Sequence, residues 1–411
     1  MNGSLGTHPA HRWFHNGDMT GASKAYGDRT TAVHAGREDF TALGVHAPPL
    51  DLSSTYPVVD LDRAGESIDA MIAGGAPTDG GLVYSRLWNP TVARFESALA
   101  TLEGTDEAVA FASGMAGLSA ILLACTVSGQ RHVVAVRPLY GGTDHVLSTG
   151  LLGTEVTWTD AKRVGDALRP DTGLVVFETP ANPTLELVDI ADVVAQAGGV
   201  PVLVDSTFAT PVLQRPAQLG AAMVLHSATK FLGGHGDVVG GVVACTPEWA
   251  ARLRPIRIVT GAVLHPLAAY LLLRGLPTLH IRVETQQRTA TQVADFLAGH
   301  PSVTAVHHPS RPGADPLGLI GRQQSGPGSV LSFDVRGGLE AASRVATSMR
   351  LVTHAVSLGG TDSLIEHPAS LTHRVVEESA KPHESLLRMS VGLEDLEDLV
   401  ADLDQALRAA H

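Results

Sequence analysis

Short apolar runs alternate with helical stretches between residues 90 and 280. The runs are rich in Val and Ala and are bounded by turn residues, which is the pattern of strands in a parallel sheet covered on both faces. Helices are expected between them, for example over 93–102 and 117–125. This alternation predicts an α/β domain with a large, mostly parallel sheet. The candidate strands are 108–111, 132–136, 155–158, 174–177, 202–204, 223–225 and 241–244.

The last third of the chain has a different pattern. A long helical stretch over 266–298 leads into it, and an amphipathic helix over 396–409 closes the chain. We therefore expect a smaller C-terminal α+β domain. Its candidate strands are 303–307, 329–334, 351–356 and 386–391.

The first part of the chain carries loop signals. Pro48-Pro49 and a Gly-rich patch at 74–81 are typical of turns and extended segments, which indicates an arm rather than a separate domain. The predicted organisation is an N-terminal arm over 1–88, a large α/β domain over 89–281 and a C-terminal α+β domain over 282–411.

Charge and apolar content exclude several classes of protein. The formal net charge is −13 and no basic face is evident, so we expect no nucleic-acid partner. Apolar runs such as 267–273 are far shorter than the ~20 residues that span a bilayer, and residues 1–21 lack the apolar stretch of a signal peptide. We expect a cytoplasmic protein without a membrane partner. Cys125 and Cys245 lie in apolar runs and are interpreted as buried thiols.

Residues that follow the candidate strands are the first place to look for a site, because ligands of open α/β sheets bind beyond the carboxyl ends of the strands. Ser113-Gly114-Met115 follows one strand and opens a helix, whose free backbone N–H groups would bind an anion. Taken alone, the segment is more often an ordinary turn between a strand and a helix. Asp205 follows another strand and either caps a helix or meets the ring nitrogen of a cofactor.

Lys230 is the most informative residue. It alone among the lysines follows a buried strand, and it lies beside Phe231 and Leu232. Burial lowers the pKa of a lysine and makes it a nucleophile for carbonyls, although a solvated loop lysine is the alternative. Ser227 and Thr229 add two hydroxyls suited to a phosphate. The other lysines lie in polar segments: Lys24, Lys162 and Lys381.

Nucleotide and metal motifs are not supported. The segment from Gly234 to Val239 has Val239 where the dinucleotide fingerprint requires Gly, and no Walker A sequence occurs. The histidines form no HExxH or similar pattern, so no metal site is expected.

These residues belong to a longer series of motifs, in which the chain resembles the Cys/Met-metabolism group of PLP-dependent enzymes. That group includes cystathionine γ-lyase, methionine γ-lyase, cystathionine γ-synthase and O-acylhomoserine sulfhydrylase. The resemblance extends from Thr31 to Leu407 and implies the fold-type I, aspartate aminotransferase-like architecture. Its segments are 31–36, 84–86, 89–91, 113–115, 140–143, 178–183, 204–208, 226–237, 356–360 and 388–392.

The resemblance implies that pyridoxal 5'-phosphate (PLP) is the cofactor. Lys230 would hold it as a Schiff base and then move protons between substrate carbons. Asp205 would pair with the pyridine nitrogen and keep it protonated, so that the ring accepts electrons. Tyr140 would stack on the ring and act as acid or base toward the departing group, and Asn182 would bond near the phenolic oxygen.

Further roles follow from the same resemblance. The phosphate would be held by Ser227, Thr229 and the backbone of Gly114 and Met115. Tyr84 and Arg86 are similar to residues that reach the phosphate from a neighbouring subunit, which implies a homo-oligomer, a tetramer built from two dimers that share active sites. Arg388 resembles the clamp for the substrate's α-carboxylate, and Ser357 would assist it.

The reaction that we expect is γ-elimination from L-methionine or L-cystathionine, which gives 2-oxobutyrate, ammonia and a thiol. Enzymes of γ-replacement, cystathionine γ-synthase and O-acylhomoserine sulfhydrylase, share this machinery and remain the alternative. Gly142 stands where methionine γ-lyases typically have Cys, whereas residues 367–373 resemble methionine γ-lyases and sulfhydrylases. A non-catalytic protein of this fold would be expected to lack Lys230, Asp205 or Arg388.

Two departures from the family pattern stand near the site. Trp88 replaces the usual Gly before Asn-Pro-Thr and is expected to reshape the substrate entrance. Ser206 replaces the usual Asn after Asp205.

Overall fold

The computed structural model describes residues 26–410, so the expectation for residues 1–21 lies outside the described part. Its larger sheet has the strand order β1-β7-β6-β5-β4-β2-β3, and β7 runs antiparallel to both of its neighbours while the other neighbours are parallel. This confirms the large, mostly parallel sheet. The strands are β1 (Glu107–Phe111), β2 (His132–Val136), β3 (Glu155–Thr159), β4 (Thr172–Glu178), β5 (Val202–Asp205), β6 (Met223–His226) and β7 (Gly241–Cys245).

Helices cover both faces of the larger sheet. The side chains of β1 show why: Ala108 and Ala110 belong to the core that contains residues of α4, whereas Val109 and Phe111 belong to the core that contains residues of α5. This alternation follows from the two-residue period of a strand. The helices of this part are α4 (Pro90–Glu103), α5 (Gly114–Val127), α6 (Gly141–Thr149), α7 (Ile190–Ala197), α8 (Thr210–Leu213), α9 (Pro247–Thr260) and α10 (Pro266–Gly275).

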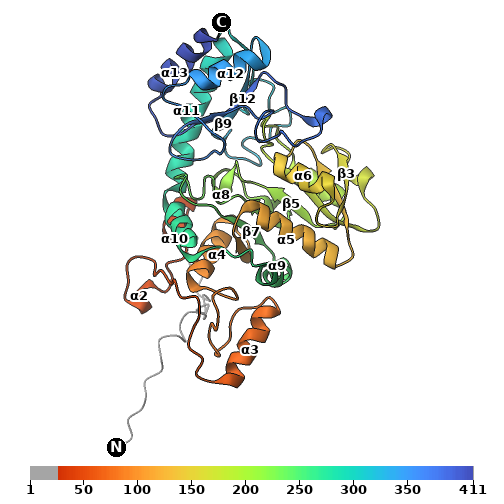
Figure 1. Cartoon of the computed structure of the whole chain (residues 1–411), viewed down its shortest axis with the longest axis vertical. Coiled ribbons are helices and arrows are strands. Elements are labelled where there is room, and N and C mark those ends of the chain that lie inside the picture. Colours follow the sequence, from red (N-terminus) through yellow and green to blue (C-terminus); the bar gives the residue numbers. More distant parts are fainter. Residues whose placement is uncertain (1–25, 411) are drawn as a thin grey trace, which may run out of the picture.

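A second sheet, ordered β10-β11-β12-β9-β8, forms the C-terminal part at the top of Figure 1. The helix α11 (Leu279–Gly299) leads up to it, and α12 (Gly338–Ser348) and α13 (Leu396–Ala409) pack against each other. The boundary expected between residues 281 and 282 lies near the start of α11. The strands are β8 (Val303–His307), β9 (Val330–Val335), β10 (Thr353–His354), β11 (Leu364–Glu366) and β12 (Leu386–Ser390).

Most of the N-terminal segment lies at the end of the molecule opposite to the C-terminal sheet (Figure 1), whereas its first helix packs against α4 and α11. It contains α1 (Asp28–His34), α2 (Phe40–Leu43) and α3 (Leu61–Ile72), which the loop signals did not predict. The start of α3 is capped by Asp60, whose side chain accepts hydrogen bonds from two backbone N–H groups of the first turn. Within residues 26–410, no helix is long and apolar enough to cross a membrane.

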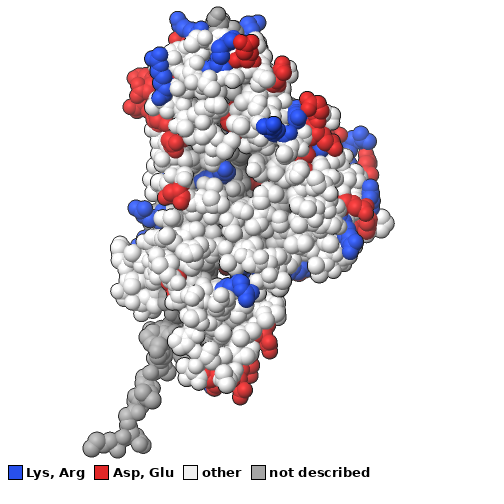
Figure 2. Space-filling model, in the orientation of Figure 1, with Lys and Arg blue, Asp and Glu red and all other residues white. Residues whose placement is uncertain are grey.

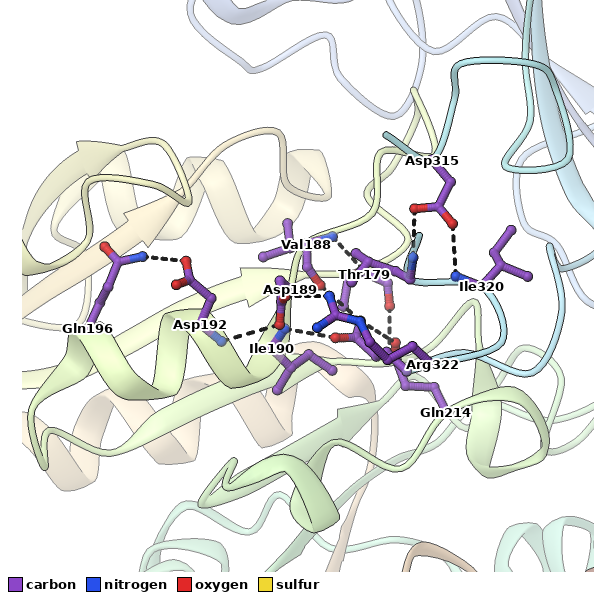
Figure 3. Close-up of polar contacts among 12 residues, drawn as sticks. Thr179, Val188, Asp189, Ile190, Asp192, Gln196, Gln214, Asp315, Ile320 and Arg322 are labelled. Atoms are coloured by element: carbon purple, nitrogen blue, oxygen red, sulfur yellow. Dashed lines mark hydrogen bonds and ion pairs between the residues drawn. The ribbon is translucent and has the colours of Figure 1, made fainter. Parts of the chain in front are cut away.

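Residues 315–325 connect the C-terminal part to the larger sheet (Figure 3). Asp315 orders this segment because its carboxylate accepts hydrogen bonds from the backbone N–H groups of Leu319 and Ile320, both at 2.8 Å. Arg322 then forms a 2.6 Å ion pair with Asp189, the N-cap residue of α7. The two sheets are thereby held together beside the carboxyl ends of β4 and β5.

Candidate active site

A cavity of about 260 Å³ lies where the larger sheet meets the C-terminal part. Its walls come from the turns after β1, β4, β5 and β6, from the start of α6 and from the segments around residues 357 and 388. It brings together most of the residues singled out in the sequence. The predicted residues that line it are Gly114, Met115, Tyr140, Asn182, Asp205, Ser227, Thr229, Lys230, Ser357 and Arg388.

Lys230 lies at the junction of the two parts. Its Nζ donates a 2.7 Å hydrogen bond to the hydroxyl of Ser357 and forms no ion pair with a described carboxylate. Burial and, to a smaller extent, the charge of Arg388 lower the pKa of Lys230 to about 8. A minority of this amine, about one fifth, is therefore neutral near physiological pH and able to attack a carbonyl, compared with less than about one hundredth for an ordinary lysine.

Asp205 ends β5 and faces the cavity. Its Oδ1 accepts hydrogen bonds from the backbone N–H of Thr207 at 3.0 Å and from the Thr207 hydroxyl at 2.6 Å, while Oδ2 has no hydrogen bond to a described residue. Burial raises the pKa of Asp205, and the Thr207 hydrogen bonds and His226 oppose the rise. His226 itself forms a buried 2.5 Å contact with Glu103. Asp205 is thus fixed through one oxygen, and its other oxygen remains available.

A polar network supports the backbone behind Asp205. The buried side-chain amide of Gln214 donates to the carbonyl oxygen of Thr179 at 3.1 Å and to the hydroxyl of Ser206 at 3.3 Å. Gln323 from the C-terminal part donates to the Oε1 of Gln214 at 3.0 Å. Figure 3 shows Gln214 and Thr179 within this network. The Ser that replaces the usual Asn at position 206 therefore accepts a hydrogen bond from Gln214, and Gln214 in turn contacts the C-terminal part.

Glu178 organises the wall of the cavity next to Asp205. It ends β4 directly beside Asp205 of β5, and its two carboxylate oxygens accept hydrogen bonds from the backbone N–H groups of Asn182 at 2.7 Å and Tyr140 at 2.9 Å. Burial, and then the neighbouring Asp205, raise the pKa of Glu178. Asp205 was selected from the sequence because its carboxylate follows a buried strand. Glu178 has the same kind of position, at the end of β4, but the sequence analysis did not select it.

Tyr140 precedes α6 and is partly exposed. Burial, and then the charge of Glu366, raise the pKa of its phenol, so the hydroxyl is protonated at neutral pH. A Cβ atom added at Gly142 would lie 2.6 Å from Cε1 of Tyr140. The Gly that departs from the typical Cys of methionine γ-lyases therefore leaves the space that the Tyr140 ring occupies.

The start of α5 forms the anion-binding end of the cavity. Ser113 caps the helix by accepting a hydrogen bond from Ala116, and the backbone N–H groups of Gly114 and Met115 form no hydrogen bond with described residues. A Cβ atom on Gly114 would lie 3.1 Å from Cβ of Ser227, which faces it. These groups fit a phosphate, because free N–H groups and the helix dipole favour an anion.

Thr229 lines the same end, but its hydroxyl is already engaged within the chain. It donates to the carbonyl oxygen of Gly240 at 3.1 Å and accepts from the N–H of Gly240 at 3.0 Å. Its role as a phosphate ligand remains a prediction.

Arg388, in β12, is buried on the C-terminal side of the cavity. Its Nη1 donates to Asn182 Oδ1 at 3.0 Å, and its Nη2 donates to the carbonyl oxygen of Ser357 at 3.0 Å. Nη2 also forms a 2.7 Å ion pair with Glu366 of β11, a residue that the sequence analysis missed. Ser357 has a φ of 103°, a strained conformation for a residue with a side chain, and it contacts both Arg388 and Lys230.

Three residues near the N-terminal segment do not line the cavity of this chain. Arg86 donates a 2.8 Å hydrogen bond to the carbonyl oxygen of Ile258, and its guanidinium lies 5.5 Å from the ring centre of Tyr84. Trp88 packs against the core formed by Met71, Leu87 and Ile258. The structure therefore does not place Trp88 at the entrance of this chain's own cavity.

The residues present fit PLP. An amine with a lowered pKa, a carboxylate oxygen free of hydrogen bonds and an anion-binding helix end face one cavity, and these are the groups required by an aldehyde, a pyridine nitrogen and a phosphate. Lys230, Asp205 and the Gly114–Ser227 end would hold these three parts. Within residues 26–410, no cluster of metal-binding side chains is found.

Comparisons with known proteins agree with this fit. Residues 29–408 match the family described as Cys/Met metabolism PLP-dependent enzyme. The chain is 57% identical over 383 residues to an L-methionine gamma-lyase of Brevibacterium sandarakinum, a match that covers 93% of this chain and 98% of that protein.

Solved structures share the fold over nearly the whole chain. The structure of apo CalE6, a methionine gamma lyase from Micromonospora echinospora, superposes with a TM-score of 0.81 at 37% identity and covers 93% of this chain and 99% of the other. A cystathionine gamma synthase from Xanthomonas oryzae pv. oryzae superposes with a TM-score of 0.84 at 33% identity and covers 94% and 99%. This chain belongs to the family of PLP-dependent enzymes of Cys/Met metabolism.

Proposed function

We propose that this chain is a PLP-dependent methionine γ-lyase, which converts L-methionine to 2-oxobutyrate, ammonia and methanethiol. The observation that carries the proposal is the joining of Lys230, Asp205 and Arg388 in one cavity, in a chain that is 57% identical to a protein named L-methionine gamma-lyase. When bound, PLP supplies an electron-accepting ring that stabilises negative charge at the substrate's α-carbon.

The charges in the cavity favour methionine over cystathionine. The described side chains of this chain that line it include only four charged ones, Glu178, Asp205, Lys230 and Arg388. Asp205 and Lys230 are assigned to the cofactor, Glu178 to the backbone of Asn182 and Tyr140, and Arg388 to the α-carboxylate. No further charge remains for the distal amino and carboxylate groups of cystathionine. The apolar residues in the lining, among them Met115, Phe208, Val356 and Leu358, suit an uncharged thioether.

Proton transfer is assigned to Lys230 and Tyr140. Arg388 binds the substrate's α-carboxylate, and Ser357 holds both Arg388 and Lys230, so that the amine of Lys230 is positioned to take the proton from Cα. It would pass this proton to the bound cofactor and, neutral again, would take the next one from Cβ. The raised pKa of Tyr140 keeps its hydroxyl protonated, which makes it the acid that donates to the departing sulfur. Asp205 would face the ring nitrogen, and the positive charge of the protonated nitrogen would favour the ionised carboxylate against the effect of burial.

The active enzyme is proposed to be a homo-oligomer, a tetramer of two dimers in which residues 1–88 of each chain form an arm. Arg86 and Tyr84 would reach the phosphate bound by the neighbouring chain, because neither lines the cavity of its own chain. The N-terminal segment also exposes apolar side chains suited to an interface, and Figure 2 shows few charges on the lower left of the molecule, whereas acidic side chains gather at its lower end. The apolar side chains are Val45, Leu50, Leu52, Val58, Val59 and Leu61.

The proposed location is the cytoplasm. Cys125 and Cys245 are both free thiols, as is usual in a reducing compartment. Fractionation of cells that express the full chain would test this assignment, and recovery with membranes or in the medium would contradict it.

The reaction is tested by offering substrates separately to purified, PLP-loaded protein. Rapid release of 2-oxobutyrate and methanethiol from L-methionine alone would support the proposal, and slower release from L-cystathionine would support the charge argument. If methionine and cystathionine are both inert, and O-acetyl- or O-succinyl-homoserine reacts only after cysteine or sulfide is added, the protein is a γ-replacement enzyme and the proposal is wrong.

A further inference from the structure

Arg388, the proposed clamp for the α-carboxylate, already has a buried anionic partner. The ion pair with Glu366 measures 2.7 Å, and the two side chains are only 3% and 1% exposed. The pairing is fixed by the sheet, because Glu366 of β11 lies directly opposite Arg388 of β12 in the antiparallel register. A buried charge of this kind is not screened by solvent, so it acts strongly on any second anion that approaches Arg388.

The donors of Arg388 are partly used before substrate arrives. Nη1 donates a hydrogen bond to Asn182 and Nη2 donates one to Ser357, and Nη2 also forms the ion pair with Glu366. A guanidinium has five N–H groups, so one N–H of Nη1 and the N–H of Nε remain. Nε is buried and has no hydrogen-bond partner among the described residues. A carboxylate that binds here would therefore share the guanidinium with Glu366.

Glu366 is itself incompletely satisfied. Its Oε1 accepts a 3.0 Å hydrogen bond from the hydroxyl of Thr372 in addition to the contact with Arg388, whereas its buried Oε2 has no partner among the described residues. If the only role of this carboxylate were to hold Arg388 in place, a neutral amide would offer the same Oε1 acceptor without a buried charge. The negative charge of Glu366 compensates the charge of the buried guanidinium, and a carboxylate that binds to Arg388 has to compete with it.

We propose that Glu366 is the resident counter-anion of Arg388 and weakens the binding of the α-carboxylate, so that it determines how tightly amino acids and the oxo-acid product are held. This inference rests on the proposed role of Arg388. Two carboxylates that share one guanidinium repel each other, and this repulsion opposes substrate binding and product retention to a similar extent. The 2-oxobutyrate product keeps the same carboxylate, so Glu366 favours its release.

The test uses the PLP-loaded enzyme and two ligands that lack a leaving group. L-norleucine replaces the sulfur of methionine by a methylene, and n-pentylamine is norleucine without its carboxylate. The change in absorbance of the bound cofactor gives the dissociation constant of each ligand. The ratio of the two constants isolates the contribution of the α-carboxylate.

Glu366→Gln is expected to bind norleucine about tenfold more tightly than the unmodified enzyme, with little change for pentylamine, because only a ligand with a carboxylate is relieved of the repulsion. Glu366→Asp keeps the charge and is expected to retain a ratio close to that of the unmodified enzyme. Glu377→Gln is the matched control, since it removes an exposed carboxylate whose partner Arg137 lies 3.5 Å away. It is expected to change neither constant.

Unchanged or weaker norleucine binding by Glu366→Gln would overturn the inference and assign Glu366 a structural role. If that variant does not fold, Glu366→Asp and the unmodified enzyme still decide the question. If the unmodified enzyme bound norleucine more than about 10⁴-fold more tightly than pentylamine, the α-carboxylate would be bound at full strength and Glu366 would not compete with it. This result would overturn the inference. Equal affinity for norleucine and pentylamine in both the unmodified enzyme and Glu366→Gln would instead show that Arg388 is not the carboxylate clamp, which is a failure of the proposed function.

Discussion

The two ends of the cavity are built in different ways. The sheet end consists of Glu178, Asp205 and Lys230, which follow or end parallel strands of the larger sheet. Backbone N–H groups hold the two carboxylates, whereas the amine of Lys230 contacts Ser357 of the other end. The C-terminal end consists of Ser357 and Arg388, together with Glu366 behind Arg388, and depends on a strained residue and a buried ion pair. The difference indicates that the two ends have separate roles. The sheet end holds the cofactor, and the C-terminal end orients and releases the substrate.

Lys230 is the residue on which both ends depend, so its loss is expected to have the largest effect. Lys230→Ala should lower kcat at least ~10³-fold, because the amine that moves protons is removed. Release of 2-oxobutyrate from L-methionine measures the effect, with the exposed Lys162→Ala as the control. A variant that kept full activity and covalently attached PLP would contradict the assignment.

The pH dependence of the unfolding free energy tests whether the amine of Lys230 is buried between the two ends of the cavity. Its pKa is about 8 in the folded chain against 10.5 as the ordinary value, so the unfolded chain binds more protons between these pH values. The stability of the cofactor-free protein should therefore rise, on account of Lys230, as the pH increases from about 8 to 10.5, by roughly 3 kcal/mol.

Urea unfolding of cofactor-free protein across this pH range tests the prediction. Lys230→Met should lack this part of the rise, whereas Lys162→Met should keep it. Equal pH dependence in all three proteins would show that the Lys230 amine is not perturbed by burial.

Variants at one end alone should separate kcat from KM. Asp205→Asn is expected to lower kcat by about 10²-fold, because the ring nitrogen loses its carboxylate, while KM for methionine changes little. Arg388→Lys is expected mainly to raise KM, because an ammonium does not reproduce the planar donors of Arg. Steady-state kinetics with L-methionine provides both constants. If kcat and KM changed in the same way in both variants, the two ends of the cavity would not have separate roles.

The contribution of a neighbouring chain to the sheet end is tested by Arg86→Ala. Activity should fall about tenfold, because a phosphate partner is lost. Arg86→Ala and Lys230→Ala chains that are unfolded together and refolded should recover about a quarter of full activity, because half of the dimers would then contain one intact site. No recovery in properly assembled mixtures would place Arg86 in the site of its own chain or outside any site.

The smallest effect is expected where the two parts are joined behind Asp205. Gln323→Ala leaves the buried Oε1 of Gln214 and the N–H of Ile190 without their partner and should cost about 1–2 kcal/mol of unfolding free energy. Urea unfolding measures this loss, and Gln218→Ala, which changes an exposed glutamine, is the control. An unchanged stability would show that this contact is dispensable.

The sheet end was predictable because its signals are local. The strand at 132–136 was predicted with the bounds that the structure has, and Asp205 and Lys230 were selected because each follows or ends a buried run. The helical stretch over 266–298 was predicted as continuous, but Pro277 lies in a 3₁₀ turn, Leu276–Thr278, between α10 and α11. Proline lacks the N–H that a continuous helix requires, which explains the interruption.

The C-terminal end was less predictable because its geometry depends on contacts between distant segments. The strand expected at 351–356 is reduced to Thr353–His354, because the chain turns away toward the strained Ser357. The three-residue strand β11 has too few residues to show alternation, so the position of Glu366 opposite Arg388 appears only in the sheet register. The family resemblance identified Arg388, but it gave no sign of its buried partner.

Covalent trapping of the cofactor tests the central claim most directly. The PLP-loaded protein would be reduced with borohydride and digested, and the peptides would be analysed by mass spectrometry. The account predicts one reduced pyridoxyl group per chain, on Lys230, and a lower yield when L-norleucine is present during reduction. Attachment at Lys24, Lys162 or Lys381, or no attachment to a protein that nevertheless releases 2-oxobutyrate from methionine, would contradict it.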